Sequence, residues 1–138
     1  MSQRYGPPIT LDAAKRAAAA ALDEARRNNW TMAAAVVDPG GFLVYFERMD
    51  DTQHASAQIA IDKARSAALF KRPTRSFQDT LAGGGAGTRV LRLRGAIPVD
   101  GGLPLVLADR IVGAIGLSGG MSDQDGQCAA AGAKALPD

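Results

Sequence analysis

The chain has a single histidine, His54, and a single cysteine among its 138 residues, so few side chains can bind a metal or attack a carbonyl. His54 follows the acidic pair Asp50 and Asp51 and precedes a segment with helical spacing. A histidine beside a carboxylate is the usual pairing for general base catalysis, and a neutral imidazole can also ligate a metal. If a helix begins near residue 55 or 56, the positive end of its dipole favours the neutral ring. His54 is therefore the first candidate for catalysis, with Asp50 and Asp51, and for metal binding. The alternative is an exposed residue in a polar turn.

Other groups could complete a binding site. Met49 could be a soft axial ligand, although a methionine at a strand end is typical of the core. The stretch GGGAG, residues 83–87, precedes Arg89, Arg92 and Arg94, and could present backbone N–H and guanidinium groups to a phosphate or carboxylate. It lacks the Lys-Ser or Lys-Thr ending of a P-loop. The alternative is a mobile loop followed by a solvated basic strand.

Asp62, Lys63 and Cys128 favour structural roles. Asp62 and Lys63 lie within the expected second helix, where an ion pair or a helix-surface position is the simplest interpretation. Cys128 lies among alanines in the expected last helix and is predicted to be a buried small hydrophobic residue.

Composition excludes several classes of protein. Hydrophobic residues make up 46% and charged residues 22%, which is typical of a globular chain, and the length fits one domain, residues 1–138. Sixteen basic against fourteen acidic residues leave a net charge of +2, which does not indicate a nucleic-acid partner. No apolar run approaches the ~20 residues needed to span a bilayer, and the first residues do not resemble a secretory signal. We therefore expect no membrane partner and a cytoplasmic location, with which an unpaired cysteine agrees.

Hydrophobic periodicity predicts the elements of the first half. Apolar residues from Leu11 to Ala25 have helical spacing after a Thr10 cap, and this helix should end near residues 28–29. Residues 31–38 are apolar at odd and even positions, which favours a strand covered on both faces. The turn PGG, residues 39–41, then leads into a returning strand over residues 42–49.

The second half predicts further helices and strands. A helix is expected over residues 56–70 and a shorter one over 72–82, with Thr74 as its cap. Apolar segments at 96–99, 103–108 and 111–118 indicate an antiparallel meander. Ser122 and Asp125 then have the spacing of a capping box for a last helix. The order of elements predicts an α+β fold, an antiparallel β-sheet flanked by helices.

Three stretches carry a resemblance to a known family: VVDPGGFLVYFERMD, IAIDKARSAALFKRPT and GGLPLVLADRIVGAIGLSGGMSDQDGQCAAAGAKAL. In this order they resemble the GlcG/HbpS-like family, also called the haem-degrading domain family, over residues 10–136. The resemblance implies a profilin-like α+β fold, a homo-oligomer, and for some members the binding of haem or related tetrapyrroles. It implies no shared activity, since members also accompany catabolic enzymes.

Two positions depart from the family pattern. Asp51 stands where the family usually has glycine, so the loop that carries His54 could take another path. The last hairpin has Asp109 and Arg110 in place of Asp-Gly, and a tight type I′ turn there would place Arg110 at positive φ.

Three functional hypotheses follow. The first is a haem or small-molecule binding protein, accessory to a catabolic pathway, whose ligand lies near residues 49–58 and 83–94. The second is a small enzyme that acts on an organic acid or aromatic catabolite by acid–base chemistry centred on His54. The third is an assembly partner of a neighbouring enzyme. In the first, haem is the expected cofactor, with His54, Met49, Arg89, Arg92 and Arg94 as its candidate contacts.

Overall fold

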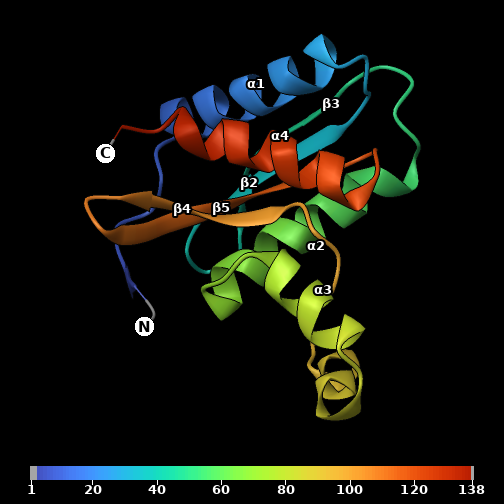
Figure 1. Cartoon of the computed structure of the whole chain (residues 1–138). Coiled ribbons are helices and arrows are strands. Elements are labelled where there is room, and N and C mark those ends of the chain that lie inside the picture. Colours follow the sequence, from blue (N-terminus) through green and yellow to red (C-terminus); the bar gives the residue numbers. More distant parts are fainter. Residues whose placement is uncertain (1–2, 138) are drawn as a thin grey trace.

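The computed structural model describes residues 3–137, which form a sheet with helices on both faces (Figure 1). The strands are β1 (Arg4–Tyr5), β2 (Ala33–Val37), β3 (Leu43–Arg48), β4 (Gly102–Leu107) and β5 (Arg110–Ser118). The helices are α1 (Leu11–Arg27), α2 (Ala55–Phe70), α3 (Thr74–Ala82) and α4 (Ser122–Lys134), with a 3-10 helix, η1 (Gly85–Arg92). The predicted α+β fold is confirmed.

Strand β5 organises the sheet. It pairs antiparallel with β2 and with β4, and β3 pairs antiparallel with β2. The short β1 adds one parallel pairing at the start of β5. Helices α1 and α4 lie together on one face of the sheet, and α2 lies on the other with α3 and η1 beyond it (Figure 1). Every residue of β2 is buried, as predicted for a strand covered on both faces.

Small residues let the helices approach the sheet closely. The inward face of α1 consists mostly of alanines, and α2 presents a similar stripe that includes Ala60, Ala64 and Ala67. A side chain at Gly116 of β5 would collide with the backbone of Ala60, so α2 lies directly on this strand. None of the helices in residues 3–137 combines the length and apolar character that crossing a membrane requires.

The predicted strand over residues 96–99 does not form. The N–H of Ile97 donates to Ser66 Oγ at 3.1 Å, and the N–H of Asp100 donates to Gln78 Oε1 at 2.7 Å. Pro98 has no N–H to donate. Side chains of α2 and α3 therefore satisfy the backbone groups that a strand would have used.

The basic segment after the glycines is also not a strand. Gly84 and Gly85 have φ values of +68° and +57°, and the chain then turns into η1. A 3-10 helix has about three residues per turn, which brings Val90 and Leu93 to the same side, toward α3. Packing of Val90 with Phe77 thus overrides the strand-like alternation of the sequence.

Two predicted helix caps are wrong. Thr74 is the first residue of α3, and its hydroxyl accepts the N–H of Gly102 at 2.9 Å instead of capping the helix. Helix α4 is capped at Met121, whose N–H donates to Gln124 Oε1 at 2.9 Å.

The turn between β4 and β5 is formed by Ala108 and Asp109, with φ values of 49° and 61°. Because Leu107 pairs with Arg110, the arginine lies in β5 and avoids positive φ.

Candidate functional site

Helix α3 and η1 enclose a cavity of about 380 Å³, here called the α3–η1 cavity. In Figure 1 these two elements project from the lower end of the molecule. The lining combines apolar with cationic side chains and includes Arg72, Phe77, Thr80, Arg89, Val90 and Leu93. Its volume lies within the range of about 300–1,000 Å³ that is typical of small-molecule sites.

The apolar wall of this cavity is well ordered by packing. The rings of Phe70 and Phe77 meet edge to face, with centroids 5.2 Å apart, and Val90 joins their buried cluster. Gly87 allows η1 to approach α3, since any side chain there would collide with the carbonyl group of Thr80. The wall can therefore receive the flat or aliphatic part of a ligand.

Two guanidinium groups stand at the cavity. Arg72 lies over the Phe77 ring, 5.5 Å from its centroid, and donates to the carbonyl of Phe70 at 3.0 Å. Arg89 donates through Nε to the carbonyl of Ala86 at 3.1 Å, which leaves its terminal nitrogens available. Both arginines are exposed, so they can exchange water for an anionic group. An apolar wall with cations at its edge suits a ligand with a hydrophobic body and carboxylate or phosphate groups.

The three predicted arginines lie at different places in the structure. Arg89 lines the α3–η1 cavity, whereas Arg94 lines a second cavity, of about 360 Å³, beside Asp62 and Arg65 of α2. Arg92 is exposed and lines neither cavity. Arg72, two residues after the end of α2, was not among the predicted site residues. The sequence feature that could have indicated Arg72 is its position as a basic residue between two predicted helices.

The loop that carries His54 lies elsewhere on the chain. His54 is exposed and immediately precedes α2, while Phe70, at the other end of this helix, contacts Phe77. A helix of 16 residues spans about 24 Å. Within a single chain, His54 therefore does not lie next to the Phe70–Phe77 pair.

The other predicted residues of this loop also face different surroundings. Asp50 and Asp51 are exposed, and Asp51 has a φ of 65°. Met49 packs against the larger core cluster, and its sulfur accepts the N–H of Met32 at 3.4 Å, as in the core interpretation. Within residues 3–137, no three side chains of the types His, Cys, Asp and Glu come together as a metal site.

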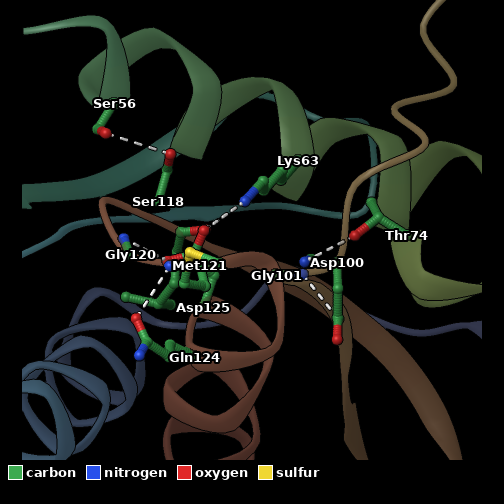
Figure 2. A network of polar contacts seen from close by, with 12 residues as sticks. Ser56, Lys63, Thr74, Asp100, Gly101, Ser118, Gly120, Met121, Gln124 and Asp125 are labelled. Atoms are coloured by element: carbon green, nitrogen blue, oxygen red, sulfur yellow. Dashed lines mark hydrogen bonds and ion pairs between the residues drawn. The ribbon is translucent and has the colours of Figure 1, made fainter. Parts of the chain in front are cut away.

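A buried polar network that the sequence analysis missed lies between α2 and α4 (Figure 2). Lys63 is 1% exposed and its ammonium group donates to Asp125 Oδ2 at 2.9 Å and to the carbonyl of Leu117 at 3.0 Å. Asp125 Oδ1 accepts the N–H of Gly120 at 2.9 Å. The ion-pair interpretation of Lys63 is therefore confirmed. Its helical spacing from Ala60 and Ala67, both on the buried stripe, was the signal that it points inward.

Burial governs the ionisation of the groups near this network. It raises the pKa of the Asp125 carboxyl, and the charge of Lys63 offsets this effect only in part. Burial, with smaller contributions from Glu24 and Asp125, raises the pKa of Cys128 to about 12. Cys128 is thus a buried, unreactive thiol, as predicted.

The chain is similar to several known proteins. The model of the family described as haem degrading protein HbpS-like matches residues 9–134. Protein GlcG of Escherichia coli is 38% identical over 100 residues, which cover 72% of this chain and 73% of that protein. The structure of a double mutant of Streptomyces reticuli HbpS is 30% identical and superimposes with a TM-score of 0.87, covering 96% of this chain and 90% of that one.

A third structure, a complex of PduOC with haem, shares the fold with a TM-score of 0.83 at 24% identity, over 94% of this chain and 95% of that one. The family match spans nearly all of the sequence, and it includes the elements that form the α3–η1 cavity and the buried network. The chain therefore belongs to the family of haem-degrading, HbpS-like proteins.

Proposed function

We propose that this protein binds haem, or a small molecule that similarly combines an apolar body with anionic groups, in the α3–η1 cavity. The observation that carries the proposal is the pairing of an apolar wall, Phe77, Val90 and Leu93, with the guanidinium groups of Arg72 and Arg89. The family description and the haem complex of a protein with the same fold support haem as the first ligand to test.

The residues present fit part of a haem. The apolar wall suits the edge of the macrocycle, and the arginines suit its propionates. The lining has no His, Cys, Met or Tyr, the side chains that usually hold haem iron. His54 is the candidate iron ligand from the sequence, and the length of α2 separates it from the Phe70–Phe77 pair. We therefore infer that coordination by His54 would require a second copy of the chain.

The enzymatic alternative finds less support in the geometry. In residues 3–137, no hydrogen bond joins His54 to Asp50 or Asp51, and all three are exposed. A general base works within hydrogen-bond reach of its partner, in a site that shields the reaction from water. Binding is therefore the function that the arrangement favours.

A haem titration followed at the Soret band tests the proposal. Arg72→Ala and Arg89→Ala should each weaken binding by about tenfold or more, because each removes a charge-assisted hydrogen bond. Arg92→Ala is the matched control, since Arg92 is exposed in the same 3-10 helix and does not line the cavity. It should leave the affinity nearly unchanged.

A separate variant tests the iron ligand. His54→Ala should shift the Soret band if His54 holds the iron, while the arginine variants should change affinity without shifting the band. If the parent binds no haem, or if the Arg92 variant loses as much affinity as the Arg89 variant, the proposed site is wrong.

A further inference from the structure

A third cavity, of about 410 Å³, lies between the start of α3, the start of β4 and the side of α4. We call it the Asp100 cavity. Its lining includes Pro73, Arg75, Asp100, Leu103, Asp123 and Gly126. It shares none of its lining residues with the α3–η1 cavity, so the proposed function makes no use of it.

The carboxylate of Asp100 lies largely buried in this cavity, and one of its oxygens accepts no hydrogen bond. The residue is 7% exposed and its side chain 10% exposed. Oδ1 accepts the N–H of Gly101 at 2.8 Å (Figure 2). Within residues 3–137, Oδ2 accepts no hydrogen bond, and Nη1 of Arg75 lies 3.9 Å away, beyond hydrogen-bond distance. Its ion-pair partner Arg75 is largely exposed, so Oδ2 can accept a hydrogen bond from a donor that enters the cavity.

The backbone holds this carboxylate in place and packs closely against it. The N–H of Asp100 donates to Gln78 Oε1 at 2.7 Å, which fixes the residue against α3. Gly126 of α4 faces the carboxylate, and any side chain there would collide with its oxygens. Glycine in a helix interior is destabilising relative to alanine. The glycine therefore lets α4 pack directly against the carboxylate.

The charges around the cavity favour a cation. Asp123 is exposed at the rim, and Lys63, the nearest buried cation, is bonded to Asp125 instead. Arg75 is 63% exposed, and its Nε also lies 3.7 Å from Asp79, so solvent and a second carboxylate share its charge. The charged residues that line the cavity, Arg75, Asp100 and Asp123, together have an excess of negative charge.

The chemistry of the lining defines the cation further. Pro73, Leu103 and Ala130 provide apolar surface, and residues 3–137 contain no cluster of ligands for a metal ion. We propose that the Asp100 cavity binds a small organic cation, with a primary ammonium group donating to Asp100 Oδ2 and a short aliphatic body against this apolar surface. Burial raises the pKa of the Asp100 carboxyl, which agrees with a partly desolvated carboxylate that would gain from an ammonium partner.

The experiment is an NMR titration of the full chain, without haem, with n-butylammonium, n-butanol and n-butyrate. We expect saturable shifts for n-butylammonium that centre on the amides of Gly101 and Gly126, and at least about tenfold weaker binding of the neutral and anionic analogues. Comparable binding of n-butanol would mean an apolar cavity without charge recognition and would overturn the proposal. So would the absence of saturable shifts.

Variants locate the interaction. Asp100→Asn keeps an acceptor for the Gly101 N–H and removes the charge, and should weaken n-butylammonium binding by about tenfold or more. Gly126→Ala, whose added methyl group would displace the carboxylate, should have the same effect. Asp12→Asn, on the exposed first turn of α1, removes an equal charge elsewhere and should bind like the parent. Unchanged binding in the first two variants, or an equal loss in the Asp12 variant, would contradict the site.

Discussion

The ammonium group of Lys63 connects three separate elements. It extends from α2 to the carbonyl of Leu117 in β5 and to Asp125 in α4, and neither charged side chain is more than 4% exposed. A buried pair of this kind contributes little net stability compared with apolar residues of the same volume, because desolvation offsets the attraction. Removal of one partner is different, since it leaves the other charge uncompensated.

Lys63→Met should therefore lower the free energy of unfolding by about 3–5 kcal/mol, because Asp125 would lose its cation. The double variant Lys63→Met with Asp125→Leu should recover most of this loss, because no buried charge then lacks a partner. Urea denaturation of both variants beside the parent measures the two values. A single variant within about 1 kcal/mol of the parent would show that Asp125 finds another partner or water.

The pH dependence of stability tests the environment of Asp100. Burial raises the pKa of this carboxyl, and the Gly101 N–H and the charges of Arg75 and Lys63 offset the effect only in part. The folded chain thus binds the proton more tightly than the unfolded chain. The resulting stability is greatest below the ordinary carboxyl pKa and is lost as pH rises through the raised value.

Asp100→Asn cannot titrate, so the free energy of unfolding of this variant, minus that of the parent, should increase between about pH 4 and pH 7. Groups that titrate alike in both proteins cancel in this difference. Urea denaturation at several pH values provides the measurement. A difference that stays constant or decreases with pH would contradict the assigned direction.

Among single residues, the sequence indicated His54 because the chain has one histidine, and Arg89, Arg92 and Arg94 because they follow a glycine cluster. Lys63 was assigned to an ion pair or a helix-surface position, whereas Asp100 and Arg72 were not singled out. Asp125 is 62 residues from Lys63 in the sequence, and the packing of α4 on the sheet brings it to the ammonium group. No local pattern contains this information, although Lys63 on an alanine stripe indicated that a buried partner was needed.

At the scale of elements, the long periodic segments were predicted well. The four α-helices, and strands β2, β3, β4 and β5, form within a few residues of their predicted positions. The errors are the unpredicted β1 and residues 88–99, where contacts with α2 and α3 decide the structure. Ser66 accepts the N–H of Ile97, and Gln78 accepts the N–H of Asp100 just after this segment. Phe77 packs against Val90 of η1. Both effects depend on residues far away in the sequence.

The turn between β4 and β5 offers a direct test at this scale. Ala108 and Asp109 both have positive φ, which L-residues other than Asn and Asp rarely adopt without cost. Ala108→Gly should raise the free energy of unfolding by about 1 kcal/mol, because glycine adopts this conformation without strain.

The same substitution at Ala19, an exposed position within α1, is the matched control. There the backbone is helical, and glycine should lower the free energy of unfolding by about 1 kcal/mol. Thermal or urea denaturation measures both. Loss of stability at both positions would mean that the turn does not require positive φ at residue 108.

At the scale of the whole molecule, large apolar side chains remain exposed beside the β2–β3 turn. Phe42 is 69% exposed, Leu43 51% and Leu69 of α2 44%. The turn lies beside α2, because a side chain added at Gly41 would come within 3.5 Å of Leu69. These exposed residues lie near one another at the surface, and exposed apolar side chains that gather in this way often mark contacts between proteins.

We therefore expect a homo-oligomer in which this surface is covered, and a second copy is also what coordination of haem by His54 would require. Light scattering should give a multiple of the 14.3 kDa chain mass. Phe42→Asp should shift the protein toward smaller species, since it places a charge in the contact. Leu11→Asp, at a side chain with 51% exposure on α1, should keep the parent mass. A parent mass of about 14 kDa in dilute solution would contradict the oligomer and would leave His54 without a route to the α3–η1 cavity.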